Sequence, residues 1–288
     1  MSMSRSCTAR SGIQGLALIA VLWIVAALSI IATGMLHAVR AEVRVIASAR
    51  QAVVAGALGD AAINLVIQDL ISKPARPLRL ATIDKSFEGV GISVQVLPLT
   101  GLIDINAAPK SLLESLLVVA GKLATQDAAA LAQAAVDARS ARDERGRAQG
   151  FEATEDLLRI PGFDYALYAS ISPLITADAQ GGGRVNPVAA PMGVLAVLAD
   201  GNVDLANRVA TERDAGKVGV DTSSLNRAHV DDNASSQRFR MQARVPLADG
   251  ASMTSTQVVD LVNRPQSNLP WRVFRSEHRL EVVNPTSN

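Results

Sequence analysis

The chain has 288 residues, of which 49% are hydrophobic and 3% aromatic, and its formal net charge is +1. A chain of this length can bury one large core or two modest ones. Its 28 basic and 27 acidic residues give no overall positive field of the kind that draws a protein to nucleic acid. The single cysteine, Cys7, excludes a disulfide framework or a cysteine zinc cluster within one chain.

The most distinctive segment is an uncharged run near the N-terminus, residues 16–36. As a helix its 21 residues are long enough to cross the roughly 30 Å hydrocarbon core of a membrane. Cleaved secretory signals have a shorter apolar region, of about 7–15 residues, followed by a cleavage site of small residues. The nearest such sequence here, residues 47–49, lies beyond Arg40 and Arg44. We therefore predict a membrane-spanning helix rather than an ordinary secretory peptide.

The helix is expected to continue past the apolar run. In residues 37–72, apolar positions recur at steps of three to five residues, which is typical of an amphipathic helix. Pro74 and Pro77 cannot continue a helix. The pattern therefore predicts one helix from Leu16 to about Ser72, apolar on all sides in its first half and packed along a globular head in its second.

The start of this helix resembles the processing site of type IV pilin-like proteins. The resemblance rests on a short basic leader followed by the sequence GLALIAVLW, residues 15–23. It implies that a prepilin peptidase cuts between Gly15 and Leu16 on the cytoplasmic side of the membrane, and that the new N-terminus is methylated. Residues 1–15 are then a leader peptide. Gly12 is the competing cleavage residue, but a cut there would bring a glutamine and a second glycine into the apolar segment.

One departure from the pilin pattern points to a subfamily. Most pilin-like proteins carry a glutamate at the fifth residue after the cut, where this chain has Ala20. A lone carboxylate in apolar surroundings is costly unless it is paired, and the family's glutamate is thought to meet the free amine of a neighbouring subunit. A subunit without it needs no neighbour ahead of it, so the chain resembles the K family of minor pseudopilins of the type II (general) secretion pathway. The resemblance assigns assembly roles to Leu18, Leu22 and Trp23. The alternative is that Ala20 only faces lipid in an ordinary anchor.

Strand patterns lie on both sides of a helical stretch. Residues 79–83 and 91–97 read as strands, the second with a clear alternation. Residues 104–226 are rich in alanine and leucine at helical spacing, which predicts a helical domain. Further strand patterns follow at 239–245, 255–262 and 271–275, and residues 248–251 between the first two are expected to form a turn.

The two groups of strands should meet in one sheet. We therefore predict an α+β fold, with a pilin-like long N-terminal helix, an antiparallel sheet, and a large all-α domain inserted between strands. The predicted divisions are a leader (1–15), a transmembrane and assembly helix (16–36), the first part of the head (37–103), the helical domain (104–226) and the C-terminal strands of the head (227–288).

A short repeat occurs within the helical stretch. IDINAAP (residues 103–109) and VNPVAAP (residues 185–191) align without a gap, and an apolar helix pattern follows each. Asp104 and Asn186 are expected to turn the chain through hydrogen bonds from backbone to side chain. The proline that closes each motif suits the first turn of the following helix.

Two further helix starts are predicted from capping residues. Ser111 and Glu114 have the spacing of a capping box. Thr154, followed by two acidic residues, is expected to start a capped helix that stops at Pro161-Gly162. The two repeat motifs and the stretch that ends at Pro161-Gly162 also resemble segments of the K family, so that the resemblance covers nearly the whole chain.

The sequence predicts no catalytic centre. His37, His229 and His278 are the only histidines, and none lies in a nucleophile elbow or a metal-ligand pair. We therefore predict that the protein is not an enzyme and that His229 and His278 are structural or solvated. Residues 181–183, three glycines, lack the lysine and hydroxyl residue of a phosphate loop, so they are interpreted as a flexible connector.

Calcium and nucleic acid are the two other ligands that local patterns suggest. Residues 200–204 open like a calcium loop but lack the required later residues, and a polar turn before a helix is the favoured interpretation. The family resemblance leaves calcium binding in the head open, with no ligands assigned, and no other cofactor is required. Residues 104–228 hold 12 basic and 16 acidic residues, a net charge of −4, which disfavours binding to phosphate backbones.

The resemblance implies a minor pseudopilin at the tip of the type II secretion pseudopilus, initiating or capping assembly and supporting protein export. It implies a single-pass protein of the cell inner membrane with a periplasmic head. The implied partners are minor pseudopilins I and J, the prepilin peptidase and exported proteins. The alternative is an unprocessed, membrane-anchored periplasmic binding module, including one of the helix-hairpin-helix type that binds DNA.

Overall fold

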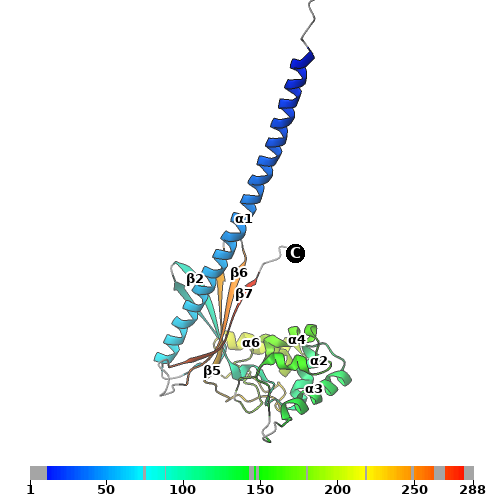
Figure 1. The fold of residues 1–288 in the computed structure, drawn as a ribbon. Helices are drawn as coiled ribbons and strands as arrows, with labels where there is room; N and C mark the ends of the chain where they lie inside the picture. The colour runs from blue at the N-terminus through cyan, green and yellow to red at the C-terminus, as the bar shows by residue number, and fades with distance from the viewer. Residues whose placement is uncertain are drawn as a thin grey trace, which may run out of the picture. The chain divides into compact units, whose positions relative to one another are not determined.

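The computed structural model describes residues 12–73, 76–87, 89–142, 146, 149–179, 181–217, 219–247, 250–262 and 270–281 (Figure 1). The chain divides into two compact units, Met1–Val54 and Ala55–Asn288. The first unit consists of the N-terminal part of one long helix, and the second contains the sheet and the remaining helices.

The long helix α1 (Gly12–Ser72) ends at the residue that the sequence predicts and begins a turn before Leu16. Its last part belongs to the second unit. There the apolar side chains that recur at three- and four-residue steps are at most 3% exposed and pack on the sheet: Ala62, Ile63, Val66, Ile67 and Leu70. A single buried stripe of this kind is what holds an amphipathic helix on a sheet.

Five antiparallel strands form the sheet, in the order β1-β2-β5-β6-β7. Their bounds are β1 (Ala81–Phe87), β2 (Val90–Pro98), β5 (Arg238–Pro246), β6 (Ser252–Asp260) and β7 (Arg272–Glu281). β2 pairs with β5, so strands from before and after the helical stretch meet in one sheet. The predicted α+β fold is therefore confirmed.

All five strands differ from their predicted bounds by at least one residue, and β6 begins three residues and ends two residues earlier than predicted. β1 begins later than predicted, because the Leu80 N–H donates to the Val188 carbonyl oxygen at 3.0 Å instead of joining the sheet. β7 continues to Glu281, six residues beyond the predicted end at Arg275. β7 lies at the edge of the sheet and is largely exposed, so it shows no buried alternation to mark its length. The predicted turn at 248–251 falls partly on residues outside those described.

Helices fill the chain between β2 and β5, and Figure 1 shows several of them gathered beside the sheet. They are α2 (Lys110–Val119), α3 (Thr125–Ser140), α4 (Tyr165–Ile171), α5 (Met192–Leu198) and α6 (Val203–Asp214), with short 3-10 helices η1 (Leu99–Gly101), η2 (Thr154–Arg159) and η3 (Ser172–Leu174). We call residues 99–237 the insert. A two-residue parallel ladder, β3 (Ile103–Asp104) with β4 (Ile175–Thr176), also lies in it, and is too short for any periodicity to predict. The predicted domain limits, 104 and 226, stay predictions.

The repeat forms the same local structure twice. The Asn106 N–H donates to Asp104 Oδ1 at 2.9 Å, and the Val188 N–H donates to Asn186 Oδ1 at 3.1 Å. These two turns are therefore as predicted. In each motif the helix begins at the residue after the closing proline, and the two helices α2 and α5 pack together.

The other two helix starts differ from the prediction. Ser111 does not cap α2, because its Oγ lies 3.0 Å from Nε2 of His229 instead of accepting a backbone N–H. Thr154 begins a 3-10 helix rather than an α-helix. The group that caps this turn is Asp156, whose Oδ2 accepts from the N–H of Ala153 at 3.0 Å. Side chains that reach distant partners are unavailable for local caps.

Gly183 corrects the interpretation of the glycine run as a connector. Its φ is +77°, and a Cβ added there would lie 2.2 Å from the carbonyl oxygen of Ala107. Cβ atoms added at Gly181 and Gly182 would meet nothing within 4 Å. Gly183 is thus required by close packing against the first repeat motif.

His229 is a structural residue in the core of the insert. It is 2% exposed, and its carbonyl oxygen accepts from the Val185 N–H at 2.9 Å. Its Nε2 contacts Ser111, while Nδ1 has no hydrogen-bond partner among the described residues. Burial lowers the pKa of His229, although the charge of Asp200 opposes this effect.

We expect Gly183→Ala to lower the free energy of unfolding by about 2–4 kcal/mol. Alanine is strained in the left-handed backbone conformation of this position, and its Cβ would clash with the Ala107 carbonyl oxygen. Gly182→Ala is the matched control and should change it by less than about 0.5 kcal/mol. Urea unfolding of the full chain in a mild detergent, followed by circular dichroism, measures both. Equal stabilities of the two variants would contradict the close approach.

We expect His229 to make folding pH-dependent. Because burial lowers its pKa in the folded state, its contribution is fully present above its ordinary pKa of about 6.5 and is lost as the pH falls through the lowered value. His229→Gln cannot titrate, so the stability advantage of the wild type over this variant should shrink on acidification. Ser111→Ala, which leaves the imidazole buried, should keep the wild-type slope. Parallel slopes for wild type and His229→Gln would show that His229 makes no contribution.

Candidate functional site

The predicted processing and assembly residues all lie in the first unit, on α1. Gly15 and Leu16 belong to the helix, but their side chains lie outside those described. The predicted assembly side chains are exposed: Leu18 75%, Leu22 70%, Trp23 72%, and Ala20. The roles of these residues stay predictions.

The stretch Leu18–Ile31 is apolar and exposed on every side of the helix. Its one hydroxyl is satisfied internally, because Ser29 Oγ donates to the Val25 carbonyl oxygen at 2.8 Å. Thr33, just beyond, does the same to the Ser29 carbonyl oxygen at 2.7 Å. An uncharged helix whose hydroxyls bond to its own backbone is suited to hydrocarbon or to packing among other apolar helices.

Leu18–Ile31 is shorter than a membrane span, and among the described residues the one stretch long and apolar enough to cross a membrane by length and composition is Ile46–Ser72. However, 44% of the most apolar 18-residue segment within it is buried. It also carries Arg50, Asp60 and Asp69. We therefore regard its last part as the core helix of the head, and the earlier apolar stretch as the one that fits a single-pass membrane anchor.

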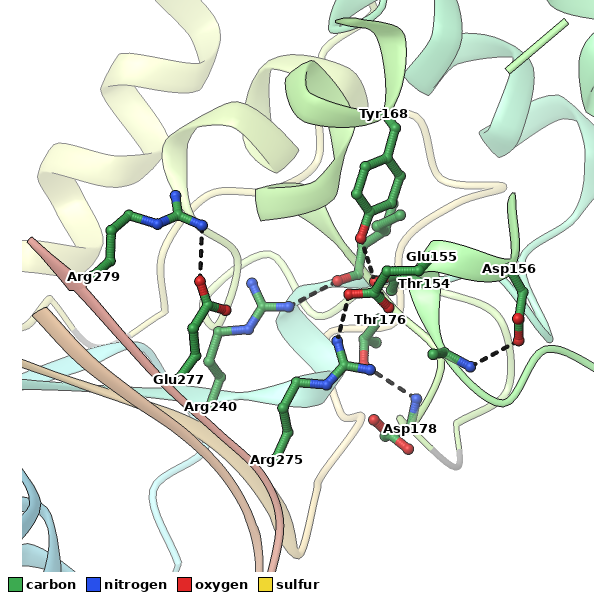
Figure 2. Close-up of polar contacts among 12 residues, drawn as sticks. Thr154, Glu155, Asp156, Tyr168, Thr176, Asp178, Arg240, Arg275, Glu277 and Arg279 are labelled. Atoms are coloured by element: carbon green, nitrogen blue, oxygen red, sulfur yellow. Dashed lines mark hydrogen bonds and ion pairs between the residues drawn. The ribbon is translucent and has the colours of Figure 1, made fainter. Parts of the chain in front are cut away.

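A polar cluster joins the insert to the sheet (Figure 2). Arg240 of β5 donates from Nη1 to the Pro173 carbonyl oxygen at 2.9 Å and from Nη2 to the Ile175 carbonyl oxygen at 2.8 Å. These carbonyls lie in η3 and at the start of β4. Burial lowers the pKa of Arg240 to about 10, so it keeps its charge at neutral pH. A charged donor to two carbonyls is a strong tie between segments far apart in the sequence.

The same cluster continues onto β7. Arg275 Nη1 lies 3.3 Å from Glu155 Oε1, and the other oxygen of this carboxylate accepts from Thr154 Oγ1 at 3.2 Å. The Thr154 hydroxyl also lies 3.0 Å from the hydroxyl of Tyr168. Burial alone would raise the pKa of Glu155, but its own backbone N–H, Arg275 and the two hydroxyls outweigh this and lower it. Burial raises the pKa of Tyr168.

This arrangement anchors the insert to the sheet. The contacts drawn in Figure 2 pair arginines with carboxylates and carbonyl oxygens, join hydroxyls to one another, and bind backbone N–H groups to Asp156 and Thr176. The cluster therefore fixes the position of the insert.

Sequence reasoning missed this anchor, although one signal is present. Arg238 and Arg240 alternate with the buried Phe239 and Met241 along β5, which places the two arginines on one face of the sheet. Nothing local identifies their acceptors, which are the carbonyls of Pro173, Ile175 and Asp178.

No group of three or more histidine, cysteine, aspartate or glutamate residues that could hold a metal ion occurs among the described residues. The loop that resembles a calcium site forms the start of α6, where Asn202 Oδ1 accepts from the Leu205 N–H at 3.0 Å. This is the polar turn before a helix that the sequence favours. Calcium binding elsewhere in the head stays a prediction.

Comparison with known proteins identifies the fold but not the sequence family. No protein-family model matches the chain, and no curated protein matches it in sequence. A solved structure does match: the GspK-GspI-GspJ complex from the enterotoxigenic Escherichia coli type 2 secretion system. The likeness has a TM-score of 0.50 and 14% identity, and covers 83% of this chain and 99% of that chain. At this identity it is a likeness of fold, and the α+β fold of the chain, with helices set between the strands of an antiparallel sheet, is GspK-like.

Proposed function

We propose that the chain is a minor pseudopilin of the K family, at the tip of a type II secretion pseudopilus. The observation that carries the proposal is the likeness in fold to a chain of the GspK-GspI-GspJ complex, over 83% of this chain. The exposed apolar surface of Leu18–Ile31 supports it, because pseudopilins need a helix that is stored in a membrane and then packed in a filament.

In the proposed pathway, residues 16–36 first anchor the chain in the inner membrane, with the head in the periplasm. Prepilin peptidase cuts between Gly15 and Leu16, and the freed helix then packs against partner helices through Leu18, Leu22 and Trp23. Ala20 offers no carboxylate to the amine of a subunit ahead, so the chain accepts neighbours below it only.

The insert is proposed to act as a steric block. It adds the helices α2 to α6 beside the sheet, and Arg240 and Arg275 tie it to β5 and β7. Held in this way, the insert would block a further subunit from stacking ahead and would meet exported proteins. Minor pseudopilins I and J of the same system are the proposed partners, no cofactor is required, and the role is structural rather than enzymatic.

We expect coexpression with a prepilin peptidase to yield a mature protein that begins at Leu16 and is methylated there. The glycine before the cut must fit the peptidase, so Gly15→Val should leave the leader attached. Gly12→Val is the matched control and should be processed normally. Intact-mass measurement of the purified chains distinguishes these products.

An intact Met1 in the wild type would favour the unprocessed binding module instead. A start at Ile13 that only Gly12→Val abolishes would move the processing site but keep the pseudopilin class. These outcomes separate the two proposed functions without any assay of secretion.

We expect an antibody against the head to label one end of each pseudopilus. The reason is that a subunit without the carboxylate, and with a bulky insert, should enter the fibre only once. Immunogold electron microscopy of sheared fibres measures the position, and an antibody against the major pseudopilin serves as the control that labels the whole shaft. Labelling by the head antibody along the shaft would rule out the tip position.

A further inference from the structure

The part of α1 that packs in the second unit is held in two different ways. From Ala62 to Leu70 it contributes large apolar side chains that are almost fully buried. From Ala55 to Asp60 the buried positions are small, namely Ala55, Gly56 and Gly59. Since hydrophobic stabilisation scales with apolar area, at about 25 cal/mol per Å², this earlier segment gains little from burial.

Polar contacts replace the missing apolar area in the segment 55–60. Ser255 Oγ of β6 donates to the Gly56 carbonyl oxygen at 3.2 Å. Gln257 Nε2, also of β6, donates to Asp60 Oδ1 at 3.1 Å. His278 Nε2 of β7 lies 3.0 Å from the other carboxylate oxygen of Asp60. One carboxylate therefore joins the helix to two strands.

Gly56 and Gly59 let the helix approach the strands closely enough to form these contacts. A Cβ added at Gly59 would lie 2.6 Å from Ser255 Oγ, and one added at Gly56 would lie 3.3 Å from Cδ2 of His278. Any side chain at Gly59 would push the helix away from the strands. The polar contacts at residues 55–60 are also incomplete, because Gln257 Oε1 is buried without a hydrogen-bond partner among the described residues. A buried acceptor without a donor costs about 1–3 kcal/mol.

We propose that residues 55–60 are a releasable clamp, which can leave the sheet while residues 62–70 stay bound. The clamp lies at the start of the second unit, directly after the boundary at Val54. Its release would free six further residues of α1, about 9 Å of helix at 1.5 Å per residue. The free part of the helix would then have two lengths, an adjustment that the proposed function does not require and on which it does not depend.

The test measures release of the clamp separately from release of residues 62–70, which we call the seat. In a Cys7→Ser background, Ala55→Cys reports on the clamp and Ala62→Cys on the seat, since both side chains are buried. The full chain, in detergent micelles under native conditions, is labelled with a maleimide, and the two rates are compared. We expect position 55 to label faster than position 62.

Asp60→Ala removes both carboxylate oxygens that contact the strands and should raise the labelling rate at position 55 by about 5- to 20-fold, with less than a twofold change at position 62. Asp69→Ala is the matched control, because Asp69 lies on the same helix and is paired with Lys85 at the other end of the seat. It should leave position 55 unchanged. Ser255→Ala tests the clamp independently, and should also accelerate labelling at position 55 only.

An unchanged rate at position 55 in both Asp60→Ala and Ser255→Ala would overturn the proposal. A parallel rise at positions 55 and 62 would also overturn it, since the helix would then leave the sheet as one body. Either result would leave the proposed function intact, because processing at Leu16 and the tip position do not involve the clamp.

Discussion

The pairing of β2 with β5 is the constraint on which the rest of the head depends. It joins residues 93–98 to residues 239–244 across the whole insert. Closing so long a loop costs entropy, though the cost grows only slowly with loop length. The insert offsets this cost by folding around its own apolar residues and through two of its carbonyl oxygens, which accept hydrogen bonds from Arg240 of β5. The sheet and the insert therefore depend on each other for position.

The register of the sheet places the attachment of α1 on one face and the attachment of the insert on the other. Ala243 of β5 pairs with Ser255 of β6, and Ser255 contacts α1, so this face carries the helix. Arg240 lies on the opposite face, since it is an odd number of residues away, and there it holds the insert. A shift of one residue in β5 would exchange the two faces of this strand and turn Arg240 away from the insert.

The helix α1 has three kinds of surface, and each has a different physical basis. The N-terminal stretch Leu18–Ile31 is exposed and apolar, which suits lipid or other helices. The last stretch, Ala62–Leu70, is apolar and buried on the head. Between them, polar contacts centred on Asp60 hold a segment of small residues. The helix thus has its strongest attachment to the head in the stretch that is farthest in sequence from the exposed apolar one.

Features set by near neighbours were determined by the sequence itself: the end of α1 before Pro74, the alternation of β2, and the turns at Asp104 and Asn186. Each depends on contacts within a few residues, so its pattern can be recognised locally. Only the tertiary structure decided that Ser111 contacts His229, that Gly183 packs against Ala107, and that Arg240 holds the carbonyl of Ile175. These partners are distant in sequence and meet only when the sheet register and the insert have formed, so no local pattern specifies them.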